Sequence, residues 1–77
     1  MACNLETTRE KVAAVDRAIG AMRALSELNP TRAEPFRRAI SAAISGGARV
    51  DTFRALADEI DAAYRAQALA NAKGGNQ

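Results

Sequence analysis

The chain has 77 residues and a net charge of +2, with one cysteine and no histidine. A domain of this size has a thin hydrophobic core and usually gains stability from a disulfide, a metal or a second chain. The lone cysteine excludes an internal disulfide, and a closed metal site is not expected without histidine. We therefore expect one domain over residues 1–77, with flexible termini at 1–4 and 73–77, stabilised by a protein partner.

The first helix is predicted over residues 5–28, because Asn29 precedes Pro30 and is disfavoured in the α conformation. Its apolar residues form two stripes that together cover roughly 200° of the helix, twice what one packing face requires. The first stripe has heptad spacing and contains Val12, Val15, Ile19 and Met22. The second contains Ala14, Ala18, Ala21, Leu25 and Leu28. We predict that both stripes form interfaces, and the sequence leaves open which one faces inward.

A shorter second helix is predicted over residues 35–45, capped by Thr31 or beginning at Pro35. Gly46-Gly47 is expected to end it, since glycine readily adopts the left-handed conformation. The apolar stripe of this helix contains Phe36, Ala39, Ile40, Ala43 and Ile44.

The third helix is predicted over residues 52–72, with Asp51 as its cap. Its apolar face contains Phe53, Leu56, Ala57, Ile60, Ala63 and Tyr64. The carboxylates of Asp58, Glu59 and Asp61 are expected to form a solvated acidic face. The fold class is thus all-α, a small three-helix antiparallel bundle that forms a dimer. A hetero-complex, or a closed monomer in which the later helices cover both stripes of the first, are the alternatives.

Catalysis is not expected, because histidine, the usual general base near neutral pH, is missing. Cys3 has no assigned base nearby, and Gly46-Gly47 lacks the Lys-Ser/Thr pair of a phosphate-binding loop. We therefore predict a non-enzymatic protein without cofactor or metal.

A nucleic-acid- or nucleotide-binding protein is the alternative function. Its contacts would be the central arginines Arg32, Arg37, Arg38 and Arg49. The third helix argues against this reading, since its acidic residues would repel phosphates.

The favoured function is a non-catalytic protein–protein interaction module: an adaptor, co-chaperone or inhibitor of a larger protein or complex. The Gly46-Gly47 break and the spacing of Phe53, Leu56 and Ala63 are similar to small helical co-chaperones of bacterial secretion needles. Arginine outnumbers lysine and alanine is abundant, a bias typical of GC-rich bacteria and their phages. We expect no membrane partner, because no long apolar run is present, and a cytoplasmic location, because a lone cysteine fits a reducing compartment.

Overall fold

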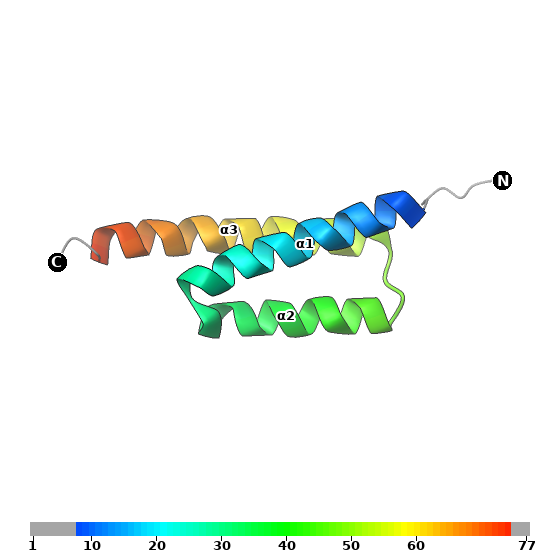
Figure 1. The fold of residues 1–77 in the computed structure, drawn as a ribbon, viewed down its shortest axis with the longest axis horizontal. Helices are drawn as coiled ribbons and strands as arrows, with labels where there is room; N and C mark the ends of the chain where they lie inside the picture. The colour runs from blue at the N-terminus through cyan, green and yellow to red at the C-terminus, as the bar shows by residue number, and fades with distance from the viewer. Residues whose placement is uncertain (1–7, 75–77) are drawn as a thin grey trace.

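The computed structural model describes residues 8–74. They form three α-helices, α1 (Thr8–Leu28), α2 (Pro30–Ser45) and α3 (Val50–Gly74), without a strand in the described range. This confirms the all-α prediction. The helices lie side by side, and the chain reverses direction at each connection (Figure 1). The predicted extension of the first helix to residue 5 and the predicted flexible segment 1–4 lie outside the described residues.

The start of the second helix was predicted wrongly, because α2 begins five residues earlier than residue 35, at Pro30. Asn29 both ends α1 and begins α2. Its backbone N–H donates to the Leu25 carbonyl at 2.8 Å, and its side-chain oxygen accepts from the Arg32 N–H at 3.1 Å. Pro30 occupies the first helical position, where proline costs no hydrogen bond. The sequence signal that stops one helix is therefore also the N-cap of the next.

Pro35 lies inside α2 rather than at its start. A proline there removes the hydrogen bond to the carbonyl four residues earlier, at Thr31. Both residues are exposed. The missing bond therefore falls on the solvent side of the helix, where water can satisfy the free carbonyl.

The predicted glycine stop at the end of α2 is confirmed at Gly47, which has a φ of 69°. The following N–H of Ala48 donates back to the Ala43 carbonyl at 2.9 Å. Because α3 already begins at Val50, Asp51 lies in its first turn and is not its cap as predicted. At the other end α3 continues to Gly74, so residues 73 and 74, predicted as flexible tail, are helical.

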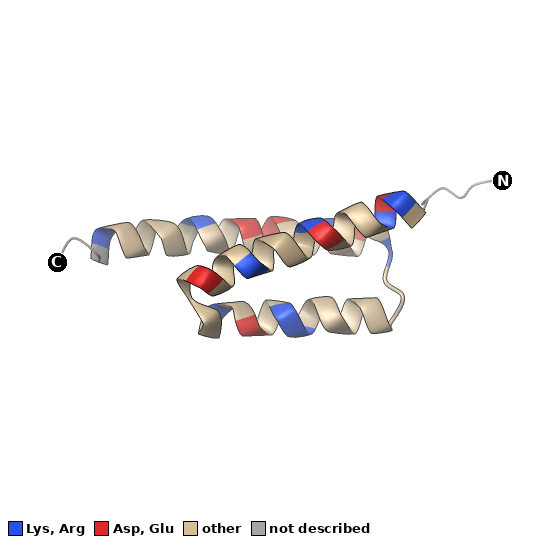
Figure 2. Cartoon of the chain, in the orientation of Figure 1, with Lys and Arg blue, Asp and Glu red and all other residues tan. Residues whose placement is uncertain are grey.

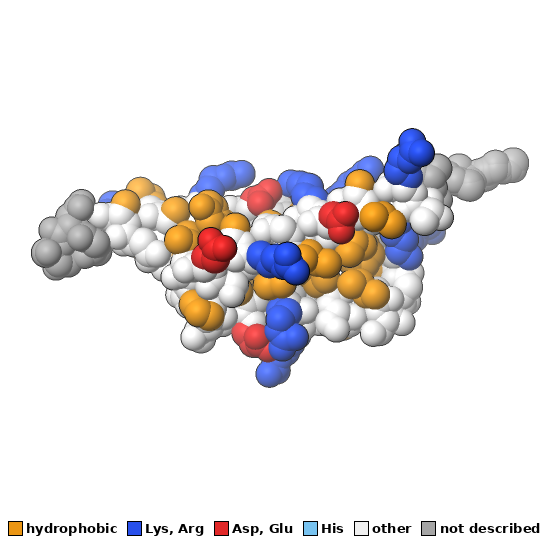
Figure 3. Space-filling view, viewed as in Figure 1, with side chains coloured by type: hydrophobic (Ala, Val, Ile, Leu, Met, Phe, Trp, Pro, Cys, Tyr) orange, Lys and Arg blue, Asp and Glu red, His pale blue; other side chains and the backbone are white. Residues whose placement is uncertain are grey.

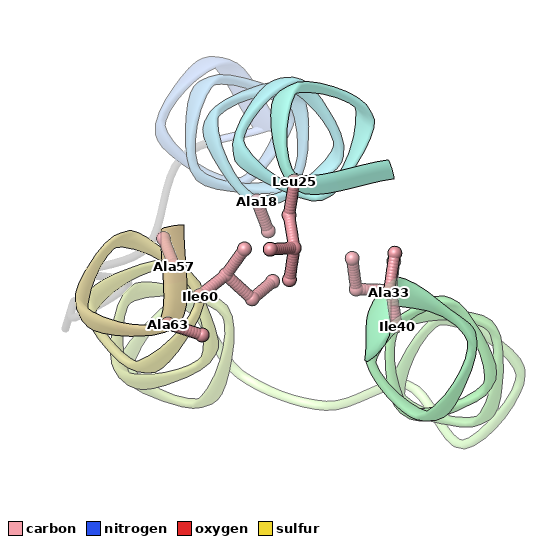
Figure 4. Packing of buried hydrophobic residues seen from close by; sticks show 7 residues of the cluster. All are labelled: Ala18, Leu25, Ala33, Ile40, Ala57, Ile60 and Ala63. Atoms are coloured by element: carbon pink, nitrogen blue, oxygen red, sulfur yellow. The ribbon is translucent and has the colours of Figure 1, made fainter. Parts of the chain in front are cut away.

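The main core lies where the three helices meet. Figure 4 shows its side chains pointing into the space between the helices. This cluster consists of Ala18, Leu25, Ala33, Ile40, Ala57, Ile60 and Ala63. Four of these seven residues are alanines, which let the helices approach closely but bury little apolar area each. A second, smaller cluster of Ala14, Val50 and Phe53 closes the end of the molecule near the α2–α3 connection.

The helices do not share contacts equally. α1 packs extensively against α3 and also against α2, while α2 and α3 contact each other least. The side-chain amide of Asn29 donates to Gln67 at 3.1 Å, which joins the α1–α2 turn to α3. Beyond Gln67, α3 extends past the ends of the other two helices (Figure 1). α1 is therefore the central helix, in contact with both of the others.

Candidate functional site

The second stripe of α1 faces the core of its own chain. Ala14, Ala18 and Leu25 are buried there. Ala21 is partly buried and packs against the same core, and Leu28 is also partly buried. Because α2 and α3 of the same chain cover these residues, a partner could contact them only if the bundle opened. The surface available to a partner has to lie elsewhere on α1.

The first stripe of α1 is only partly covered. Ile19 and Met22 are partly buried against the main core, and Val15 packs against the smaller cluster. Val12 remains 52% exposed. Exposure therefore increases toward the N-terminal half of α1, where α2 leaves this stripe uncovered.

An apolar groove lies between this half of α1 and the C-terminal end of α2. Its volume is about 340 Å³. It is lined by Thr8, Lys11, Val12, Val15, Asp16, Ile44 and Phe53. Figure 3 shows hydrophobic side chains gathered over the seam between α1 and α2. Ile44 is 50% exposed, so two half-exposed aliphatic side chains from different helices line the same groove.

Local structure fixes the shape of the groove. Phe53 is fully buried and belongs to the cluster with Ala14 and Val50, so its ring forms a rigid lining. The turn at Gly47 ends α2 just beyond Ile44 and leads directly into α3. The groove is present in the single chain, without a partner.

Two opposite charges, Lys11 and Asp16, also line the groove. At 3.6 residues per turn their side chains project roughly 140° apart, on either side of the stripe that contains Val12 and Val15. Within residues 8–74 neither side chain has a hydrogen bond or ion pair. The groove is thus an apolar surface flanked by one unpaired cation and one unpaired anion.

The sequence did not indicate this groove as a unit. Val12 and Val15 were predicted as interface residues, but Phe53 and Ile44 were assigned only to the apolar stripes of their own helices. The placement of Lys11 and Asp16 beside the heptad stripe was a usable signal, since charges flanking such a stripe commonly pair between chains. Their position beside Ile44 follows from how α2 docks on α1.

The four candidate arginines do not form one patch. Arg37 and Arg38 both bind the Glu34 carboxylate, with Arg37 Nε at 3.0 Å and Arg38 Nε at 3.3 Å. Arg32 projects from α2 roughly 120–140° away from that pair. Arg49 lies beyond the far end of α2, a helix of 16 residues that spans about 24 Å. Figure 2 shows both signs of charge on all three helices.

Glu34 partly neutralises the basic charge at the centre of α2. The hydrogen bond from Arg37, assisted by that from Arg38, lowers the pKa of the Glu34 carboxyl to about 2. The same contact raises the pKa of the Arg37 guanidinium above its usual value. A phosphate approaching this pair would have to displace the carboxylate.

A wider depression lies on the outer side of α2. It is lined by Pro30, Thr31, Glu34, Pro35 and Arg38. All five residues belong to one helix, so the depression is the surface between successive turns and not a cleft between elements. We do not regard it as a binding site.

The acidic residues of α3 lie at the surface, as predicted, and two of them also contact α1. The side chains of Asp58 and Asp61 are 72% and 38% exposed, and both accept hydrogen bonds from Nη2 of Arg17, at 2.8 and 3.0 Å. Only Glu59 has no partner within the described residues. The Asp58 hydrogen bond is the main cause of a raised pKa at Arg17. These contacts hold α1 against α3 on the side away from the groove and are structural.

No group of three or more potential metal ligands occurs among the described residues. None of the described helices is long and apolar enough to cross a membrane. No family model matches the chain, and neither a curated protein nor a solved structure is significantly similar to it.

Proposed function

We propose that the chain is a non-catalytic protein–protein interaction module whose contact surface is the groove between α1 and α2. The observation that carries this proposal is the joint exposure of Val12 and Ile44 beside the fully buried Phe53. Isolated exposed aliphatic residues are ordinary on protein surfaces, but aliphatic residues from two helices over a preformed groove are typical of a partner site. Groove-binding helices use such anchors.

The rest of the proposal follows from the sequence. The protein would act as an adaptor, co-chaperone or inhibitor of a larger bacterial or phage complex, in the cytoplasm, as an antiparallel three-helix bundle. The thin, alanine-rich core supports this, since docking in the groove would add apolar burial that the chain alone lacks. Nucleic-acid binding is less well supported, because the central arginines are dispersed and two of them are paired with Glu34.

The test compares Val12→Glu with Leu69→Glu. Val12 is 52% exposed in the groove and Leu69 is 60% exposed on the part of α3 that extends past the bundle. The two substitutions therefore introduce the same charge at similarly exposed sites. Quantitative affinity capture from the native host, followed by mass spectrometry, should show complexes that V12E loses and L69E keeps. Complexes that persist in V12E, or that both variants lose equally, would contradict the proposal.

A further inference from the structure

The groove has a charge pattern that selects among possible occupants. In heptad terms, Val12 and Ile19 occupy a positions, and Val15 and Met22 occupy d positions. Lys11 is then a g residue and Asp16 the e residue five positions later. In a parallel pair of helices, each g residue lies beside the e residue five positions further along the other helix.

From this geometry we propose that the groove is filled by a second copy of the same chain, with the two α1 helices packed in parallel. This inference rests on the proposed function and names its partner. The seam is formed by Val12, Val15 and Ile19 of both copies. Lys11 of each copy pairs with Asp16 of the other, so a two-fold axis parallel to α1 produces two reciprocal ion pairs.

The two ion pairs require the parallel orientation. In an antiparallel pair, g residues face g residues and e residues face e residues, so Lys11 and Asp16 would lie on opposite flanks of the seam and could not pair with each other.

α2 also contributes to the proposed contact. Ile44 and Lys11 both line the groove, and Asp16 of the second copy would dock at Lys11. The helix of the second copy would therefore contact α2 as well as α1, covering the exposed half of Ile44. Each copy supplies one helix and accepts one, so every groove in the dimer is occupied.

The size of the contact sets the expected affinity. A standard stable interface buries about 800 Å² per partner, roughly a sixth of the 5129 Å² surface of this chain. The seam runs from Val12 to Ile19, little more than one heptad of α1, which places it among the smaller, reversible interfaces. The dimer is expected to dissociate in the micromolar range, within reach of sedimentation equilibrium.

The experiment exchanges the two charges. Neither Lys11 nor Asp16 has a charged residue three or four positions away on α1. Reversing either charge therefore neither breaks nor creates an ion pair between successive turns of the helix. Lys11→Glu alone and Asp16→Lys alone each convert both intermolecular pairs to like charges. At low salt we expect each to raise the dissociation constant about tenfold.

The decisive part of the test is whether dimerisation is recovered when opposite charges are restored. The double variant K11E/D16K, and an equimolar mixture of the two single variants, both restore opposite charges at each contact. Both should dimerise with a dissociation constant within about threefold of the parent. Glu59→Lys, on α3 and also without charged neighbours three or four positions away, is the matched control and should leave the constant unchanged.

Three results would overturn this inference. One is a parent chain that stays at the monomer mass of 8.1 kDa at millimolar concentration. Another is a dimer whose dissociation constant is unchanged by K11E, as antiparallel packing would predict. The third is a double variant K11E/D16K that does not regain the dissociation constant of the parent. A monomeric parent that still loses its captured partners in V12E would overturn the second-copy inference alone, whereas captured partners retained by V12E would contradict the proposed function.

Discussion

Val12 of α1 and Ile44 of α2 line the same groove, and each side chain is about half exposed although the fully buried ring of Phe53 lies beside them. Neither aliphatic residue has enough neighbours within the chain to be covered. The groove therefore joins the best-packed aromatic residue of the protein to two of its least covered aliphatic ones. This combination makes the site rigid and still able to gain apolar burial from a partner.

Phe53 should be critical for stability as well as for the groove. Truncation to alanine at a fully buried phenylalanine typically costs 3–5 kcal/mol, enough to unfold a domain this small. Phe53→Leu keeps most of the volume and should cost about 1 kcal/mol while leaving the fold intact. Chemical denaturation followed by circular dichroism measures both. Leu69→Ala is the control and should change stability by less than about 0.5 kcal/mol; an equal effect at both sites would contradict the assigned packing.

Asn29 should be more important than its place between two helices suggests. Asn29→Ala removes the α2 cap and the hydrogen bond to Gln67, and should destabilise the chain by about 1 kcal/mol or slightly more. Asn29→Asp keeps the capping acceptor but loses the donor to Gln67, so its cost should be clearly smaller. Thermal unfolding of both variants gives the comparison. Equal losses would assign the effect to the Gln67 contact instead of the cap.

The dual role of Asn29 also explains the main error of the sequence prediction. An Asn-Pro pair is compatible with the end of one helix and with the start of the next. Because Pro35 is also a good first helical residue, the second helix was predicted to start there instead of at Pro30. The structure tolerates Pro35 because its missing hydrogen bond faces solvent, a property of α2 packing that the local sequence does not contain. The glycine stop after α2 was easier to predict, because few residues other than glycine adopt the positive φ that Gly47 has.

Two glycines should respond in opposite directions to the same substitution. Gly20 lies in the interior of α1, where an added Cβ would meet no atom within 4 Å. Gly20→Ala should therefore stabilise the chain by up to about 1 kcal/mol. Gly47 has a φ of 69°, so Gly47→Ala should destabilise it by roughly 1–2 kcal/mol. Denaturation midpoints of the two variants on either side of the parent would agree with this; a shift of both in one direction would not.

Glu34 should give part of the stability a dependence on pH. Its pKa falls from an ordinary 4.5 to about 2 in the folded chain because Arg37 and Arg38 bind the carboxylate. The unfolded chain therefore binds more protons between these values, so the contribution is present above pH 4.5 and is lost as pH falls through 2. Denaturation midpoints from pH 6 to 2 should fall less steeply in Glu34→Gln than in the parent. Parallel profiles would show that the contact is not maintained in solution.

The site was harder to predict than the fold. The helix periodicity identified three helices, but both stripes of α1 are apolar and the choice between them depends on how α2 and α3 dock. In the folded chain the stripe of Ala14, Ala18 and Leu25 faces inward, where its two alanines allow a close approach of the helices. Val12 was left exposed as a result. The meeting of Val12 with Ile44 is a tertiary relationship that periodicity within one helix does not encode.

The most direct test of the central claim is a dilution series followed by amide chemical shifts in nuclear magnetic resonance. The account predicts that raising the concentration of the parent chain shifts amides of residues 8–16 and of Ile44, while the α3 segment around Leu69 stays unchanged. The same series with V12E should show no concentration dependence at these positions. Shifts confined to α3, or an unchanged spectrum up to millimolar concentration, would contradict self-association through the groove.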